Sequence, residues 1–109
     1  DVRGAPALYI IDGLCRAGAA VTVYDPVAAG KLGERYGDSI AIASKYYPAL
    51  EGADGLVIMT EWNEFRRPDY TRMGELMREK VIFDGRNLYT PAIMQSHGFR
   101  YYSIGRKTV

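Results

Sequence analysis

The stretch Leu56-Val57-Ile58-Met59, followed by Thr60-Glu61-Trp62, is the strongest indicator of fold class in this 109-residue sequence. Its four apolar residues are continuous, which is typical of a strand buried on both faces of a parallel sheet. Polar residues follow at once and end the strand. Parallel neighbours need a crossover connection, which is usually a helix. The stretch therefore predicts a sheet covered by helices on both faces.

Extended and helical patterns alternate in both directions from this stretch. The expected strands cover residues 21–24, 40–43, 56–59, 81–83 and 99–104. The expected helices cover residues 5–17, 27–36 and 46–51, with two more that open at Pro68-Asp69 and at Thr90-Pro91. Strands that alternate with helices through short loops predict an α/β fold: a doubly wound (Rossmann-like) parallel sheet with helices on both faces.

The beginning of the sequence differs from this pattern. A doubly wound sheet usually opens with a strand, whereas this sequence opens with a helix at Ala5 and does not begin with Met. We therefore expect that the first strand, which would be central in the sheet, lies before Asp1. We also expect residues 1–109 to be one domain of a longer protein.

Composition and charge restrict the classes of partner. The sequence is 48% hydrophobic and 25% charged, with a net charge of +1, so nothing in it favours a nucleic-acid or membrane partner. Its apolar runs are far shorter than the roughly 20 residues that span a bilayer. A single cysteine, Cys15, excludes an intrachain disulfide and favours a reducing compartment. We expect a cytoplasmic protein.

Ligands of doubly wound sheets bind at the carboxyl ends of the strands. Those ends carry Asp25, Thr60 with Glu61, Asp84 to Asn87, and Gly105 with Arg106. In the segment Asp84 to Asn87, Gly85 permits an unusual turn and a close ligand approach. Arg86 offers a planar fork of donors for a phosphate or carbonyl oxygen. The alternative is a surface turn in which Arg86 pairs with Asp84 or Glu61, and the residues alone leave both open.

Other candidates have weaker support. Asp25 ends a strand like the ribose-binding acid of dinucleotide folds, but no G-x-G-x-x-G precedes it, which favours a turn role. Arg3 precedes a helix and gains nothing from its dipole, so it is either a ligand or partner contact or a solvated terminal arginine. No basic residue is spaced to activate Cys15, and His97 is the only histidine. We expect no catalytic residue and no metal site.

Five segments, in order along the chain, resemble motifs of the UDP-glucose/GDP-mannose dehydrogenase family. They are Asp1-Val2-Arg3 with Ala5-Pro6 (D-x-R-x-[AS]-P), Gly18 to Pro26 (G-A-x-V-x-x-Y-D-P), Ala53 to Trp62 (A-D-x-x-x-x-x-T-E-W), Asp84-Gly85-Arg86 (D-G-R) and Gly98 to Arg106 (G-F-x-Y-x-x-I-G-R). The resemblance is to the C-terminal, UDP-binding domain of the family's UDP-glucose branch.

The resemblance implies an enzyme that oxidises UDP-glucose to UDP-glucuronate with two NAD. It implies, as partners, an N-terminal NAD-binding domain and a central dimerisation segment with the catalytic cysteine and lysine, in a homodimer. The family's D-x-R arginine, which reaches NAD, corresponds to Arg3, and its D-G-R arginine, which contacts the UDP-sugar, corresponds to Arg86. Cys15 does not match the catalytic G-G-x-C-x-P segment, so the chain alone is expected to be inactive.

Two alternatives remain open at this point. One is a stand-alone nucleotide-binding or regulatory module without chemistry. The other is the same domain of a related dehydrogenase, for example one that acts on UDP-N-acetylmannosamine.

Overall fold

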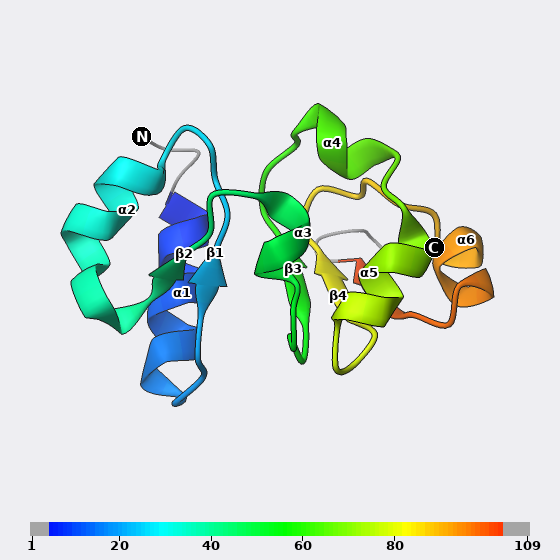
Figure 1. Cartoon of the computed structure of the whole chain (residues 1–109), viewed down its shortest axis with the longest axis horizontal. Coiled ribbons are helices and arrows are strands. Elements are labelled where there is room, and N and C mark those ends of the chain that lie inside the picture. The colour runs from blue at the N-terminus through cyan, green and yellow to red at the C-terminus, as the bar shows by residue number, and fades with distance from the viewer. Residues whose placement is uncertain (1–4, 104–109) are drawn as a thin grey trace. The chain divides into compact units, whose positions relative to one another are not determined.

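The computed structural model of the chain describes residues 5–103 and divides it into two compact units between Ala49 and Leu50, each described here by itself. Helices and short parallel strands alternate along both units (Figure 1), which confirms the predicted α/β class. The strands form one two-stranded and one three-stranded parallel sheet. No helix within residues 5–103 is long and apolar enough to cross a membrane.

The first unit contains the shorter sheet. Its elements are α1 (Ala5–Arg16), β1 (Thr22–Val23), α2 (Ala29–Tyr36), the 3₁₀ turn η1 (Gly37–Ser39), β2 (Ala41–Ile42) and α3 (Tyr46–Ala49). Gly18 follows α1 with φ of 88°, which is typical of a left-handed helix stop. Ile11 of α1 is buried, whereas Leu14, three residues further along the helix, is 36% exposed.

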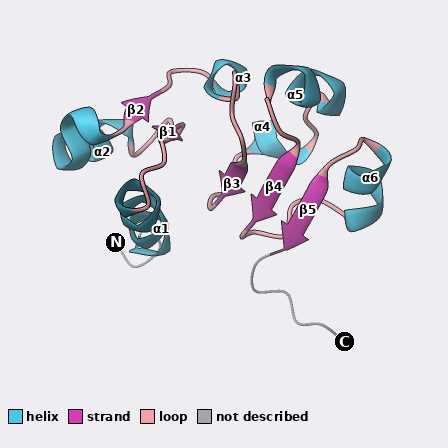
Figure 2. Ribbon diagram, turned by 90° about the horizontal axis from the view of Figure 1, so that it is seen from below, coloured by secondary structure: helices cyan, strands magenta, loops and turns pink. Residues whose placement is uncertain are grey.

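The second unit contains the strands that end at the candidate site. Its elements are β3 (Leu56–Ile58), α4 (Asn63–Arg66), α5 (Tyr70–Leu76), β4 (Val81–Asp84), α6 (Pro91–Ser96) and β5 (Arg100–Ser103). The three strands lie side by side in the order β3-β4-β5 (Figure 2). Ile58, Asp84 and Ser103 are in register across them, so the loops that follow the strands leave from one edge of the sheet.

The two faces of this sheet differ in burial. Ile82 of β4, Met73 of α5 and Met94 of α6 are fully buried, so the core lies between the two helices and the Ile82 face. The opposite face carries the stacked rings of Phe83 and Tyr102, which stay 37% and 50% exposed. Side chains alternate along a strand, so Asp84, two residues after Ile82, points to the same buried side.

The helix starts explain how the loops are placed. Asp69 caps α5, since its Oδ1 accepts a hydrogen bond from Arg72 N at 3.0 Å, and the helix opens where the sequence predicted. Thr60, which follows β3, does not cap the next helix. Trp62 is still extended, with φ of −97° and ψ of 145°, and is itself the N-cap residue of α4. Glu61 therefore stays in the loop at the end of β3.

Candidate functional site

A buried carboxylate organises the loop that follows β4. Asp84 is fully buried, and its Oδ1 accepts a hydrogen bond from Arg86 N at 2.9 Å. Its Oδ2 accepts from Leu88 N at 2.7 Å, Tyr89 N at 3.1 Å and the Tyr101 hydroxyl at 2.7 Å. These donors offset the cost of burying the carboxylate. They also fix the loop backbone in one conformation.

The loop is also held to its neighbouring strands. Gly85 N donates to the Ile58 carbonyl at 2.8 Å, and a Cβ at Gly85 would lie 2.9 Å from the same oxygen. The close approach to β3 therefore requires a glycine here, and Gly85 is not among the described glycines with positive φ, so the unusual turn that the sequence suggested is not at this residue. The left-handed residue is Asn87, with φ of 56°, and its side-chain oxygen accepts from Ser103 Oγ.

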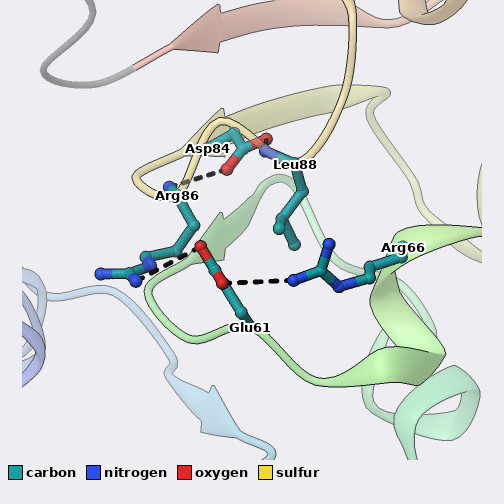
Figure 3. A network of polar contacts seen from close by, with 5 residues as sticks. All are labelled: Glu61, Arg66, Asp84, Arg86 and Leu88. Atoms are coloured by element: carbon teal, nitrogen blue, oxygen red, sulfur yellow. Dashed lines mark hydrogen bonds and ion pairs between the residues drawn. The ribbon is translucent and has the colours of Figure 1, made fainter.

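Three charged side chains meet beside this loop (Figure 3). Arg86 Nη2 lies 3.3 Å from Glu61 Oε1, and Glu61 Oε2 accepts from Arg66 Nη2 at 3.3 Å. Of the partners left open for Arg86, the structure therefore selects Glu61 for the side chain and Asp84 for the backbone N–H. Arg66 was not a candidate from sequence, because nothing in a four-residue helix indicates which way its last residue points.

This arrangement suits binding of an anion. Within residues 5–103, Glu61 is the side chain that pairs with the Arg86 guanidinium, which is 48% exposed. The Glu61 contact is made through Nη2, and a guanidinium carries further N–H donors, so a phosphate can bind Arg86 while this exposed ion pair persists. The planar fork of an arginine matches two phosphate oxygens at once. The backbone beneath it is already fixed by Asp84.

The described residues do not fit a complete NAD site. Asp25, the candidate ribose acid, uses its Oδ1 to accept from Val27 N at 2.8 Å and Ala28 N at 2.9 Å, which is the turn role. The sequence before it has no glycine-rich phosphate loop. Arg3, the predicted NAD contact, and Arg106 lie outside the described residues. Among residues 5–103 no group of three or more His, Cys, Asp or Glu side chains is arranged to hold a metal ion.

Tyr101 connects β5 to the buried carboxylate. Its hydroxyl donates to Asp84 Oδ2 and also lies 3.0 Å from the Tyr89 carbonyl oxygen. Burial raises the pKa of the Tyr101 phenol, and the hydrogen bond to Asp84 raises it further. The neutral phenol is therefore favoured in the folded state.

Tyr101→Phe is expected to lower the free energy of unfolding by about 1.5–3 kcal/mol at pH 8, because a hydrogen bond to a carboxylate is lost. A raised folded-state pKa gives a contribution that is complete below the unfolded value of 10.0 and is lost as pH rises through the folded value. The difference between wild type and Y101F should therefore shrink above about pH 10. Urea unfolding at pH 8 and at about pH 11 measures it, and a difference that stays constant would contradict the account.

Residues 1–91 match the family described as "UDP-glucose/GDP-mannose dehydrogenase family, UDP binding domain". The chain belongs to this family. This membership confirms the resemblance that rested on five short motifs. It also agrees with an anion-binding arrangement at the ends of β3 and β4, since UDP carries a diphosphate.

Individual members of the UDP-glucose/GDP-mannose dehydrogenase family are similar over the whole chain. UDP-glucose 6-dehydrogenase of Pseudomonas aeruginosa is 44% identical over 97% of the chain, and UDP-glucose 6-dehydrogenase TuaD of Bacillus subtilis is 39% identical over 100% of it. The chain spans 24% of the length of each of these relatives.

A solved structure of a UDP-D-ManNAc dehydrogenase from Pyrococcus horikoshii has a similar fold. It superposes with a TM-score of 0.56 at 24% identity, over 95% of this chain and 31% of that one. At this identity the likeness shows the fold alone.

Proposed function

We propose that residues 1–109 form the C-terminal, UDP-binding domain of an NAD-dependent UDP-glucose 6-dehydrogenase, which oxidises UDP-glucose to UDP-glucuronate. The observation that carries the proposal is the pair of UDP-glucose 6-dehydrogenases at 44% and 39% identity over almost the whole chain. The rest of that enzyme would supply the NAD-binding domain and the central segment with the catalytic residues. We expect it to act in the cytoplasm as a homodimer.

Arg86 is the residue of this chain that we assign to the UDP-sugar. It lies in the loop after β4, where the Asp84 carboxylate fixes its backbone N–H at 2.9 Å. Its guanidinium is half exposed and, among the described residues, pairs with Glu61 through Nη2, which leaves other N–H donors for a ligand. Two parallel N–H···O contacts to the diphosphate would hold the nucleotide without taking part in bond breaking.

Arg3 is the residue that we assign to NAD. The assignment depends on the D-x-R resemblance, because Arg3 lies outside the described residues. NAD would accept the hydride from the sugar on the other domains of the enzyme. This chain would contribute binding and orientation, while the nucleophile and the general base come from elsewhere.

The purified 109-residue chain is therefore expected to reduce no NAD in the presence of UDP-glucose, whereas the full-length enzyme does. The physical reason is the lack of an activated thiol: Cys15, the only cysteine, has its Sγ 3.9 Å from the Ser39 carbonyl oxygen and is not placed against a base within residues 5–103. Formation of NADH, followed by absorbance, measures this. Turnover by the isolated chain would overturn the assignment as a binding domain.

A further inference from the structure

Glu61 uses its two carboxylate oxygens for two different arginines. Oε1 lies 3.3 Å from Arg86 Nη2, and Oε2 lies 3.3 Å from Arg66 Nη2. The three residues come from three segments: the loop after β3, the end of α4 and the loop after β4 (Figure 3). Glu61 therefore connects the Arg86 guanidinium to a helix that lies outside the Asp84 loop.

We propose that Glu61 is a positioning residue for Arg86. Arg66 anchors one oxygen of the carboxylate, and the other oxygen holds the Arg86 guanidinium at the ligand edge of the sheet. The proposal rests on the proposed function, in which Arg86 contacts the UDP-sugar. Glu61 itself touches no reacting atom in this account.

The physical reason is the freedom of a half-exposed arginine. Asp84 fixes the backbone of Arg86 but leaves its long side chain to rotate, and ordering such a side chain on binding lowers affinity. A contact that already restrains the guanidinium reduces this loss. A glutamate with one partner would be nearly as mobile as the arginine. The second contact, to Arg66, restrains the carboxylate.

The charge of Glu61 acts in the opposite direction. A carboxylate beside a diphosphate site repels the ligand, so a substitution that only removed this charge would strengthen UDP-sugar binding. A substitution that released Arg86 would weaken it. The sign of the change in KM for UDP-glucose therefore separates the two roles, and the charge effect alone should fade in high salt.

The test uses four variants of the full-length enzyme: E61Q, R86A, the double variant, and D54N as a control. Asp54 forms a comparable exposed ion pair, with its Oδ2 2.7 Å from Arg78 Nη2, but it precedes β3 at the opposite end of the strand. We expect E61Q to raise KM for UDP-glucose by about 2- to 5-fold, with kcat and KM for NAD unchanged. D54N should change none of these values.

In the R86A background, E61Q should cause no further rise in KM, because the residue that Glu61 positions is absent. An unchanged or lowered KM for E61Q, together with a raised KM for R86A, would overturn the positioning role and leave the proposed function intact. An equal rise in both backgrounds would mean that Glu61 acts elsewhere. A normal KM for R86A would overturn the assignment of Arg86 to the UDP-sugar, and the positioning role of Glu61 with it.

Thermal unfolding of each variant shows whether the fold survives. If E61Q does not fold, R66Q tests the same contact from its other side, since Arg66 is 57% exposed. R66Q should cause a smaller rise in KM for UDP-glucose that also disappears in the R86A background. A KM equal to that of wild type would contradict the anchored carboxylate.

Discussion

Arg86→Ala is expected to lower kcat/KM for UDP-glucose by about 10- to 150-fold in the full-length enzyme. The change removes charge-assisted hydrogen bonds worth about 1.5–3 kcal/mol, at about 1.4 kcal/mol for each factor of ten. Initial rates at varied UDP-glucose and saturating NAD measure this effect. Initial rates at varied NAD and saturating UDP-glucose measure the effect on the use of NAD. The fold should survive, because the guanidinium is half exposed and pairs only with Glu61 among the described residues.

Two further variants control this result. Arg86→Lys should recover little, because an ammonium group does not reproduce the planar fork of donors. Arg3→Ala should chiefly weaken the use of NAD and leave the response to UDP-glucose nearly unchanged. If R86A and R3A damaged the use of both ligands equally, or if R86A left the UDP-glucose response unchanged, the assignment of the two arginines would be wrong.

Asp84→Asn is expected to lower the free energy of unfolding by about 2–4 kcal/mol, although it changes one atom of a buried side chain. The carboxylate accepts from N–H groups on both of its oxygens and also from a hydroxyl. An asparagine offers one acceptor oxygen, so its NH₂ group would face at least one backbone N–H. The displaced loop should also weaken the use of UDP-glucose, since it carries Arg86.

Asp69→Asn is the matched control for this variant. Asp69 caps α5 at the surface of the same unit, and asparagine is as good an N-cap residue as aspartate. Urea unfolding should therefore show a change of less than about 0.5 kcal/mol for D69N. Equal stability of D84N and wild type would mean that the Asp84 hydrogen bonds do not hold the loop.

The strands and their order along the chain follow from local pattern. The continuous apolar run at 56–59 and the shorter one at 81–83 each end in a polar residue, and the structure has strands at Leu56–Ile58 and Val81–Asp84. Strand alternation also predicts that Asp84 is buried, because it lies two residues after the core residue Ile82. Its charge obscured this signal, since aspartate is rarely fully buried.

Other features of the site depend on contacts between distant segments. Gly85 is required because it approaches the Ile58 carbonyl oxygen of the neighbouring strand. The local sequence around Gly85 does not indicate how closely the two strands approach each other. The pairing of Glu61 with both Arg66 and Arg86 depends on where α4 begins. Thr60 is a residue type that favours an N-cap, yet the chain stays extended through Trp62 and α4 begins at Asn63.

Hydrogen exchange of the full-length enzyme, with and without UDP, tests most directly whether this chain provides the nucleotide site. If UDP binds at the edge formed by the ends of β3 and β4, exchange should slow in peptides that contain Glu61 to Arg66 and Asp84 to Tyr89, because bound ligand covers these loops. Peptides from α1 serve as the internal reference and should not change. Protection of those two loops is the predicted result, and protection confined to residues outside this chain would contradict the account.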